Sequence, residues 1–143
     1  MADQRNKMLE IQDLTVQFGS RLHPFTAVDH VSFDIYQGET FGLVGESGSG
    51  KTTIGRAVIR IHPTAGGNII FDGQKINGRI SRSLDRQITQ RIQMIFQDPM
   101  ACLNPRKKVG EIIGEGLDIH HLYSSHAERK EKIDRILAKV GLA

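Results

Sequence analysis

Residues 40–53 read Thr-Phe-Gly-Leu-Val-Gly-Glu-Ser-Gly-Ser-Gly-Lys-Thr-Thr, and this stretch decides the fold. Its first five residues form a short apolar run, which is typical of a strand buried on both faces. Residues 45–52 then fit the pattern of a glycine, any four residues, a second glycine, a lysine and a hydroxyl residue. Residues 52–61 are predicted to form a helix that ends near Pro63. A strand, a glycine-rich loop and a helix in this order predict an α/β fold with a phosphate-binding loop.

The residue types of this loop suit a triphosphate. Glycines let the backbone turn so that successive N–H groups converge on phosphate oxygens at the positive end of the next helix. Lys51 is expected to reach the β- and γ-phosphates, Thr52 to bind Mg²⁺ through its hydroxyl, and Thr53 to lie near the α-phosphate. The candidate nucleotide-binding residues are Gly45, Glu46, Ser47, Gly48, Ser49, Gly50, Lys51, Thr52 and Thr53. The alternative is a glycine-rich turn that binds nothing. It does not explain why the lysine, the hydroxyl residue, the preceding strand and the following helix all match the motif. The loop alone does not separate an ATPase from a GTPase or a kinase.

Apolar residues alternate with polar ones before the loop, which predicts two half-buried strands over residues 9–18 and 28–35. The first has one irregularity at Asp13 and Leu14, and residues 19–24 are expected to form a loop. Beyond the phosphate loop, a strand over 67–71 is followed by a turn at Asp72 and Gly73. The remaining predicted elements are a helix over 84–92, a strand over 93–96, a helix over 109–121 and a helix from Ser125 to the stop at Gly141.

Composition limits the broad class of protein. The chain has 143 residues, of which 38% are hydrophobic and 24% charged, and this is ordinary for a globular domain. Its net charge of +3 is small, and the basic run at 106–108 has no aromatic platform, so nucleic acid is not expected as a partner. The single cysteine, Cys102, favours a cytosolic setting because it cannot form an internal disulfide. No apolar run approaches the roughly 18 residues of a membrane helix.

Two further stretches carry a resemblance to a known family. The wording of residues 43–53, together with Met94-Ile95-Phe96-Gln97-Asp98-Pro99, resembles the ATPase subunits of ABC transporters. Residues 98–106 are similar to a segment of the oligopeptide and dipeptide importer ATPases, which usually have serine where Cys102 stands. The resemblance extends from about residue 9 to residue 142.

The resemblance implies roles for residues outside the loop. Gln97 matches the glutamine that contacts the magnesium ion or the attacking water, so it is a candidate catalytic residue and metal ligand. Phe18 matches the aromatic residue that stacks on adenine, with Phe25 as the less favoured alternative. Asp72 follows an apolar strand, as a magnesium-binding aspartate does in such ATPases, but Gly73 follows it where a catalytic glutamate is needed. We therefore interpret Asp72 as part of a hairpin turn.

The resemblance also implies an organisation. The fold is expected to be a truncated P-loop NTPase of the ABC type, with residues 1–97 as nucleotide-binding core and antiparallel β subdomain. Residues 98–143 are expected to begin the helical subdomain. The family's signature motif, its Asp-Glu strand end and its switch histidine do not occur in the sequence, so we expect a fragment that is inactive alone.

Function follows from the same resemblance. The implied activity is ATP hydrolysis with Mg²⁺ that powers peptide import. A peripheral site on the cytoplasmic face of the cell membrane is implied. The implied partners are a second ATPase subunit, transmembrane permease subunits and, indirectly, an extracytoplasmic peptide-binding protein. Two alternatives remain: a soluble ABC ATPase of DNA repair or translation, and a short nucleotide-binding module without hydrolysis.

Overall fold

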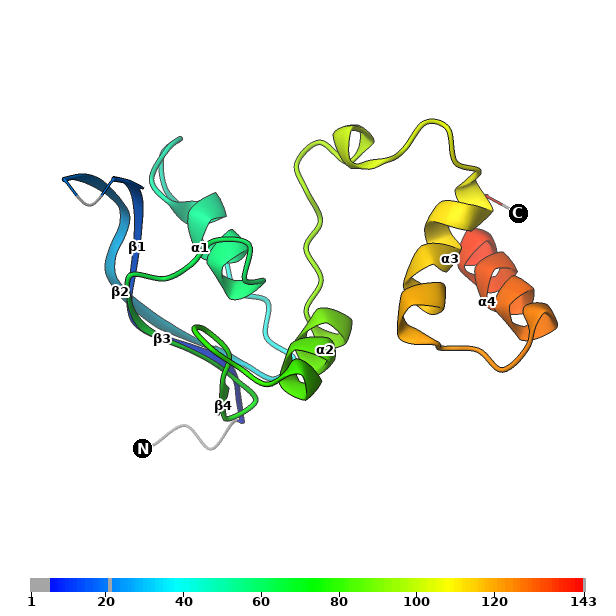
Figure 1. Cartoon of the computed structure of the whole chain (residues 1–143), viewed down its shortest axis with the longest axis horizontal. Helices are drawn as coiled ribbons and strands as arrows, with labels where there is room; N and C mark the ends of the chain where they lie inside the picture. Colours follow the sequence, from blue (N-terminus) through cyan, green and yellow to red (C-terminus); the bar gives the residue numbers. More distant parts are fainter. Residues whose placement is uncertain (1–5, 21, 143) are drawn as a thin grey trace. The chain divides into compact units, whose positions relative to one another are not determined.

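The structure, a computed structural model, describes residues 6–20 and 22–142. The chain forms two compact units that divide after Met94 (Figure 1). The first unit holds a sheet and two helices, and the second holds a single 3₁₀ turn and two further helices.

The sheet of the first unit has four antiparallel strands in the order β2-β1-β3-β4. They are β1 (Lys7–Ser20), β2 (His23–Tyr36), β3 (Gly66–Phe71) and β4 (Gln74–Lys75). The predicted irregularity in β1 is confirmed, because the register with β2 shifts between Ile11 and Leu14 and Asp13 has φ of 52°. The backbone N–H of Asp13 donates to Ser32 Oγ at 2.8 Å, which gives this bulged residue a partner.

The predicted loop over residues 19–24 is mostly wrong. Strand pairing continues to Gly19 opposite Pro24 and Ser20 opposite His23, so most of this segment belongs to a long hairpin. Gly19 has φ of 94°, and Pro24 lies on β2, one of the two edge strands of this sheet. The residue types that predicted a loop therefore serve the end of a hairpin instead, since proline is tolerated on an edge strand.

Two helices pack with the sheet around one core. These are α1 (Lys51–Val58), which confirms the predicted helix after the loop, and α2 (Arg82–Arg91), which confirms the helix predicted over 84–92. The turn predicted at Asp72 and Gly73 is also confirmed, with both residues at positive φ. Sheet and helices bury a shared set of apolar side chains: Ile11, Leu14, Val16, Val28, Ile54, Ala57, Val58, Ile69, Ile76 and Ile88.

The two short apolar strands predicted over 40–44 and 93–96 are wrong, because the structure has no strand at either place. Val44 and Ile95 are each 93% exposed. A strand buried on both faces needs neighbouring strands for its hydrogen bonds and covering layers for its side chains. Among the described residues the four strands pair with one another and none pairs with these segments.

The second unit contains η1 (Met100–Cys102), α3 (Val109–His120) and α4 (His126–Lys139). The predicted start of α4 is confirmed, since Ser125 Oγ accepts from the Glu128 N–H at 3.2 Å. Glu128 accepts in turn from the N–H of Ser124, one residue before the expected partner. The predicted stop is also confirmed, with Gly141 at φ of 74° and the Leu142 N–H bonded to the Leu137 carbonyl. Across the described part of the chain, no helix combines the length and apolar character that a membrane crossing requires.

Candidate functional site

The phosphate loop is a series of turns that leads directly into α1. Gly48 and Gly50 have φ of 83° and 90°, conformations that side-chain-bearing residues rarely adopt. The Ser49 N–H donates to the Glu46 carbonyl at 3.2 Å, and Gly50 is the left-handed residue that caps α1. The backbone path therefore explains a glycine at Gly50, which the motif requires, and at Gly48, which the motif leaves unspecified.

Gly50 also fixes the loop against the sheet. A Cβ at Gly50 would overlap the carbonyl oxygen of Ala27 and would lie 3.3 Å from Val28 Cγ2. Both neighbours belong to β2, and Val28 is part of the buried core. The absence of a side chain at Gly50 thus lets the loop and the start of α1 lie directly on the hairpin.

Lys51, the first residue of α1, turns its ammonium group back over the loop. Lys51 Nζ donates to the carbonyl oxygens of Gly45 and Glu46, each at 2.6 Å, and to Ser49 Oγ at 3.1 Å. These three acceptors match the three donors of an ammonium group. The positive charge is therefore held at the helix N-terminus, where the helix dipole also favours an anion.

Thr52 and Thr53 follow on the first turn of α1, and Thr52 is exposed. Its hydroxyl is an oxygen ligand of the kind Mg²⁺ prefers, beside a loop that would hold phosphate oxygens. The Thr52 hydroxyl would therefore suit a magnesium ion that binds together with a triphosphate. The described residues contain no cluster of three His, Cys, Asp or Glu side chains that could hold a metal without such a ligand.

Phe18 lies near the end of β1, opposite Phe25 on β2. Phe18 is 36% exposed, and its ring meets the His62 ring in a T-shaped contact with 4.9 Å between centroids. The Phe25 ring is 66% exposed. Sequence reasoning singled out Phe18 but missed His62, because the two rings are 44 residues apart and nothing in the spacing links them.

Asp72 lies far from the loop, which supports its interpretation as a turn residue. The Asp72 N–H donates to the Met8 carbonyl at one end of β1, and its carboxylate pairs with Arg91 at 2.9 Å. The loop contacts Val28, whose partner on β1 is Val16. Eight residues of strand therefore separate the two places along β1, or roughly 25 Å. Figure 1 shows the β3–β4 turn and the phosphate loop near opposite ends of the sheet.

Gln97 belongs to the second unit, on the extended segment before η1, and is exposed. Its predicted roles at the metal and in catalysis remain predictions.

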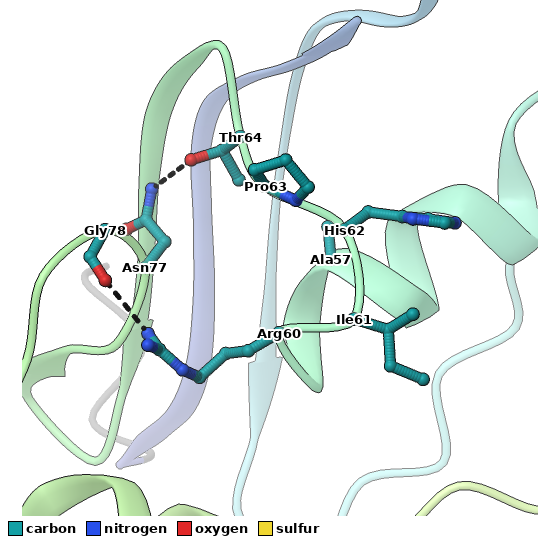
Figure 2. A pocket seen from close by; sticks show the side chains of 8 residues that line it. All are labelled: Ala57, Arg60, Ile61, His62, Pro63, Thr64, Asn77 and Gly78. Carbon is teal, nitrogen blue, oxygen red and sulfur yellow. Dashed lines mark hydrogen bonds between the residues drawn. The ribbon is translucent and has the colours of Figure 1, made fainter. Parts of the chain in front are cut away.

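A hollow of about 260 Å³ lies beside the end of α1 and is lined by Ala57, Arg60, Ile61, His62, Pro63, Thr64, Asn77 and Gly78 (Figure 2). Three of its polar side chains, those of Arg60, Thr64 and Asn77, are hydrogen-bonded. Asn77 Nδ2 donates to Thr64 Oγ1 at 2.9 Å, and Asn77 Oδ1 accepts from the Ile69 N–H. The Arg60 guanidinium donates to the carbonyls of Ile76 and Gly78. These bonds tie the segment after α1 to the sheet, so the hollow is part of the scaffold of the site.

Comparison with known proteins identifies the family. The family model described as ABC transporter matches residues 28–143, which is more than half of the chain. The chain belongs to the ABC transporter family. Members of this family hydrolyse ATP, and the loop at residues 45–53 lies within the matched residues.

Curated relatives narrow the comparison. The chain is 56% identical over 136 residues to the oligopeptide transport ATP-binding protein AmiF of Streptococcus pneumoniae, covering 95% of this chain and 44% of the relative. It is 52% identical to OppF of Streptococcus pyogenes and 48% identical to OppF of Bacillus subtilis, both named oligopeptide transport ATP-binding proteins. The chain spans less than half the length of these relatives.

Solved structures show the same fold. The ATP-binding cassette MJ0796, in a dimeric post-hydrolysis state bound to ADP and Pi, aligns with a TM-score of 0.78 at 23% identity. That alignment covers 92% of this chain and 56% of the cassette. The protein cbiO1 of Clostridium perfringens, part of the ABC transporter complex cbiONQ, aligns with a TM-score of 0.74 and covers 51% of that chain. The expected ABC-type fold is thereby confirmed.

Proposed function

We propose that this chain is part of the ATP-binding subunit of an oligopeptide importer and that it binds ATP with Mg²⁺ at residues 45–53. The observation that carries the proposal is the loop geometry: the Lys51 ammonium is held over Gly45, Glu46 and Ser49 at the N-terminus of α1. The family membership supports ATP as the nucleotide, and identities of 48–56% to oligopeptide transport proteins support the substrate class.

Each residue of the proposed site has a distinct task. Backbone N–H groups of the loop and of the first turn of α1 bind phosphate oxygens, and Lys51 exchanges its loop acceptors for the β- and γ-phosphates. Thr52 contributes its hydroxyl to Mg²⁺, Thr53 lies near the α-phosphate, and Phe18 stacks on the base. Mg²⁺ would offset the charge that develops on the phosphates during transfer.

Transport requires further subunits in this proposal. A second ATPase subunit and transmembrane permease subunits would complete the transporter, with an extracytoplasmic peptide-binding protein delivering substrate. The ATPase would then be peripheral, on the cytoplasmic face of the membrane. Gln97 would contact the nucleotide site in only one conformational state, which is what coupling two states demands. A soluble ABC ATPase of DNA repair or translation has less support, because the similar proteins described above are named for oligopeptide transport.

A Lys51→Ala variant tests the nucleotide site. We expect ATP affinity to fall at least about tenfold, because charge-assisted hydrogen bonds contribute roughly 1.5–3 kcal/mol each. The measurement is an NMR-detected titration of the 143-residue chain with Mg²⁺-ATP, which also reports weak binding. Lys130→Ala is the matched control, since Lys130 is exposed on α4 and paired with Asp134 on the same helix. Equal affinities for wild type and Lys51→Ala would refute the proposed site.

A further inference from the structure

We propose that His62 is a positioning residue for the nucleotide base: it holds the Phe18 ring on the α1 side of the sheet, where the base stacks. This inference rests on the proposed ATP site at residues 45–53. It begins from the T-shaped contact between the two rings, whose centroids are 4.9 Å apart with an interplanar angle of 84°.

The contact with His62 fixes the side of the sheet to which Phe18 turns. His62 follows α1 in the chain and lines the hollow beside the end of that helix (Figure 2). α1 packs on β1 and β2 through the buried residues Ile54, Ala57 and Val58. A Phe18 ring that touches His62 therefore lies on the same face of the hairpin as α1 and the phosphate loop.

The distance from Phe18 to the loop suits a nucleotide. The loop meets the hairpin where Gly50 lies against Val28, and Val28 pairs with Val16. Phe18 is two residues farther along β1, which corresponds to about 7 Å of strand. A ligand whose phosphates occupy the loop can therefore place its base beside the Phe18 ring.

The geometry of the ring pair leaves room for a base. In a T-shaped pair, one ring presents its edge to the other, so His62 covers at most one face of Phe18. Phe18 remains 36% exposed, and His62 is half-buried. Stacking between a base and an aromatic side chain needs one free face, which this arrangement provides.

His62 is itself held from both sides. Before it, the Arg60 guanidinium donates to the carbonyls of Ile76 and Gly78 and lies 3.3 Å from Asp85. After it, Thr64 accepts a hydrogen bond from the buried Asn77 side chain. Because these bonds fix the segment that carries His62, its ring can restrict the rotamers of Phe18 near the end of an exposed hairpin, and less side-chain freedom is then lost on binding.

The test distinguishes binding of the base from binding of the phosphates by comparing two ligands. Dissociation constants of the 143-residue chain for Mg²⁺-ATP and for Mg²⁺-tripolyphosphate are measured by NMR-detected titration. The variants are His62→Ala, Phe18→Ala and the double variant, with His62→Phe as the rescue and His23→Ala as the matched histidine control. His23 lies at the start of β2 and is exposed. The backbone spectrum of each variant verifies that the first unit is folded.

We expect His62→Ala to weaken ATP binding about threefold, as for the loss of one aromatic pair, and to leave tripolyphosphate binding unchanged. Phe18→Ala should weaken ATP binding about tenfold, as for the loss of a base stack. In the Phe18→Ala background, His62→Ala should have no further effect, because His62 acts through Phe18. His62→Phe should restore most of the affinity, and His23→Ala should match the wild type.

Several results would overturn the inference. One is an equal loss for ATP and tripolyphosphate in His62→Ala, which would mean that the substitution distorts the loop. A second is that His62→Ala weakens ATP binding as much in the Phe18→Ala background as in the wild type. A third is that Phe25→Ala, and not Phe18→Ala, weakens binding of ATP without weakening binding of tripolyphosphate. Failure of the wild type to bind either ligand would instead refute the proposed nucleotide site, and the role of His62 with it.

Discussion

At the scale of single residues, the phosphate loop shows two separate reasons for a glycine. Gly48 and Gly50 share a left-handed backbone conformation, with φ of 83° and 90°. A Cβ at Gly48 would meet no atom within 4 Å, whereas one at Gly50 would overlap the Ala27 carbonyl. Gly48 is therefore required by backbone conformation alone, and Gly50 by conformation and by its contact with β2.

The two glycines give a paired prediction. Gly48→Ala should lower the free energy of unfolding by about 1–2 kcal/mol, the cost of a left-handed backbone for a residue with a Cβ. Gly50→Ala should cost about 1–3 kcal/mol more, as for overpacking against a core strand. Urea denaturation, followed through NMR signals of β1 residues in the first unit, measures both changes. Equal losses in the two variants would show that the contact between Gly50 and Ala27 does not constrain the loop.

At the residue level, the position of the loop was predictable because a motif defines it. Gly45, Gly50, Lys51 and Thr52 follow from one pattern of eight residues, and in the structure this pattern leads into the start of α1. The neighbour of Phe18 was not predictable, because His62 reaches it only through the packing of α1 on the hairpin. A pair of rings so far apart in sequence has no local signal.

At the scale of elements, the α3–α4 hairpin is held by charged groups rather than by a large core. Arg129 donates to both carboxylate oxygens of Asp118, from Nε at 2.6 Å and from Nη2 at 2.7 Å. Gly114 is buried, and a Cβ there would overlap the Arg129 guanidinium. The small residue on α3 therefore makes space for the guanidinium that joins the two helices. Ile133 is the buried apolar side chain of α4.

This arrangement predicts an acid-sensitive hairpin. The hydrogen bond from Arg129, with a second from Tyr123, lowers the pKa of Asp118 from 3.8 to about 2. The hydrogen bond from Lys132, with the Ser124 N–H, lowers the pKa of Glu128 from 4.5 to about 2. Carboxylates with depressed pKa values stabilise the folded state above their unfolded values, and this contribution is lost as the pH falls through the folded values. The hairpin should therefore lose stability between about pH 4.5 and pH 2.

Unfolding of the second unit between pH 7 and pH 2, followed by NMR signals of α3 and α4, measures this effect. Asp118→Asn should lower stability at pH 7 and reduce the further loss on acidification. Asp134→Asn is the matched control, because Asp134 pairs with Lys130 on the same helix and does not join α3 to α4. If Asp118→Asn kept the full acid dependence of the wild type, the Arg129 pair would not be its cause.

Elements that local interactions determine were predicted correctly, whereas elements that depend on distant partners were not. The helix ends at Ser125 and Gly141 were predictable because local hydrogen bonds and backbone conformation determine them. The bulge at Asp13 was predictable because it interrupts a period of two. The predicted strands over 40–44 and 93–96 were wrong because a buried strand depends on distant partners, and the described strands pair elsewhere.

At the scale of the whole molecule, the chain carries the phosphate loop and spans less than half the length of the curated relatives described above. In the proposed site, the phosphate loop, Lys51 and Thr52 would bind phosphates and Mg²⁺, which are the first requirements of phosphoryl transfer. The reaction also needs a group that orients the attacking water and further donors on the γ-phosphate. The 143-residue sequence contains no apolar strand that ends in Asp-Glu, and Asp72, followed by Gly73, lies roughly 25 Å along the sheet from the loop.

We therefore expect the 143-residue polypeptide to bind ATP or ADP weakly and to release no measurable phosphate. Weak binding is expected because the segment before the loop forms no strand and exposes Leu43 and Val44, although Phe41 stacks on Phe33 of β2. The same exposed segment should promote association between copies at high concentration. A phosphate-release assay with Mg²⁺-ATP tests the prediction, with the Lys51→Ala polypeptide as the background. Turnover above that background would mean that residues within these 143 orient the attacking water. Gln97, exposed before η1, would then be the first side chain to replace.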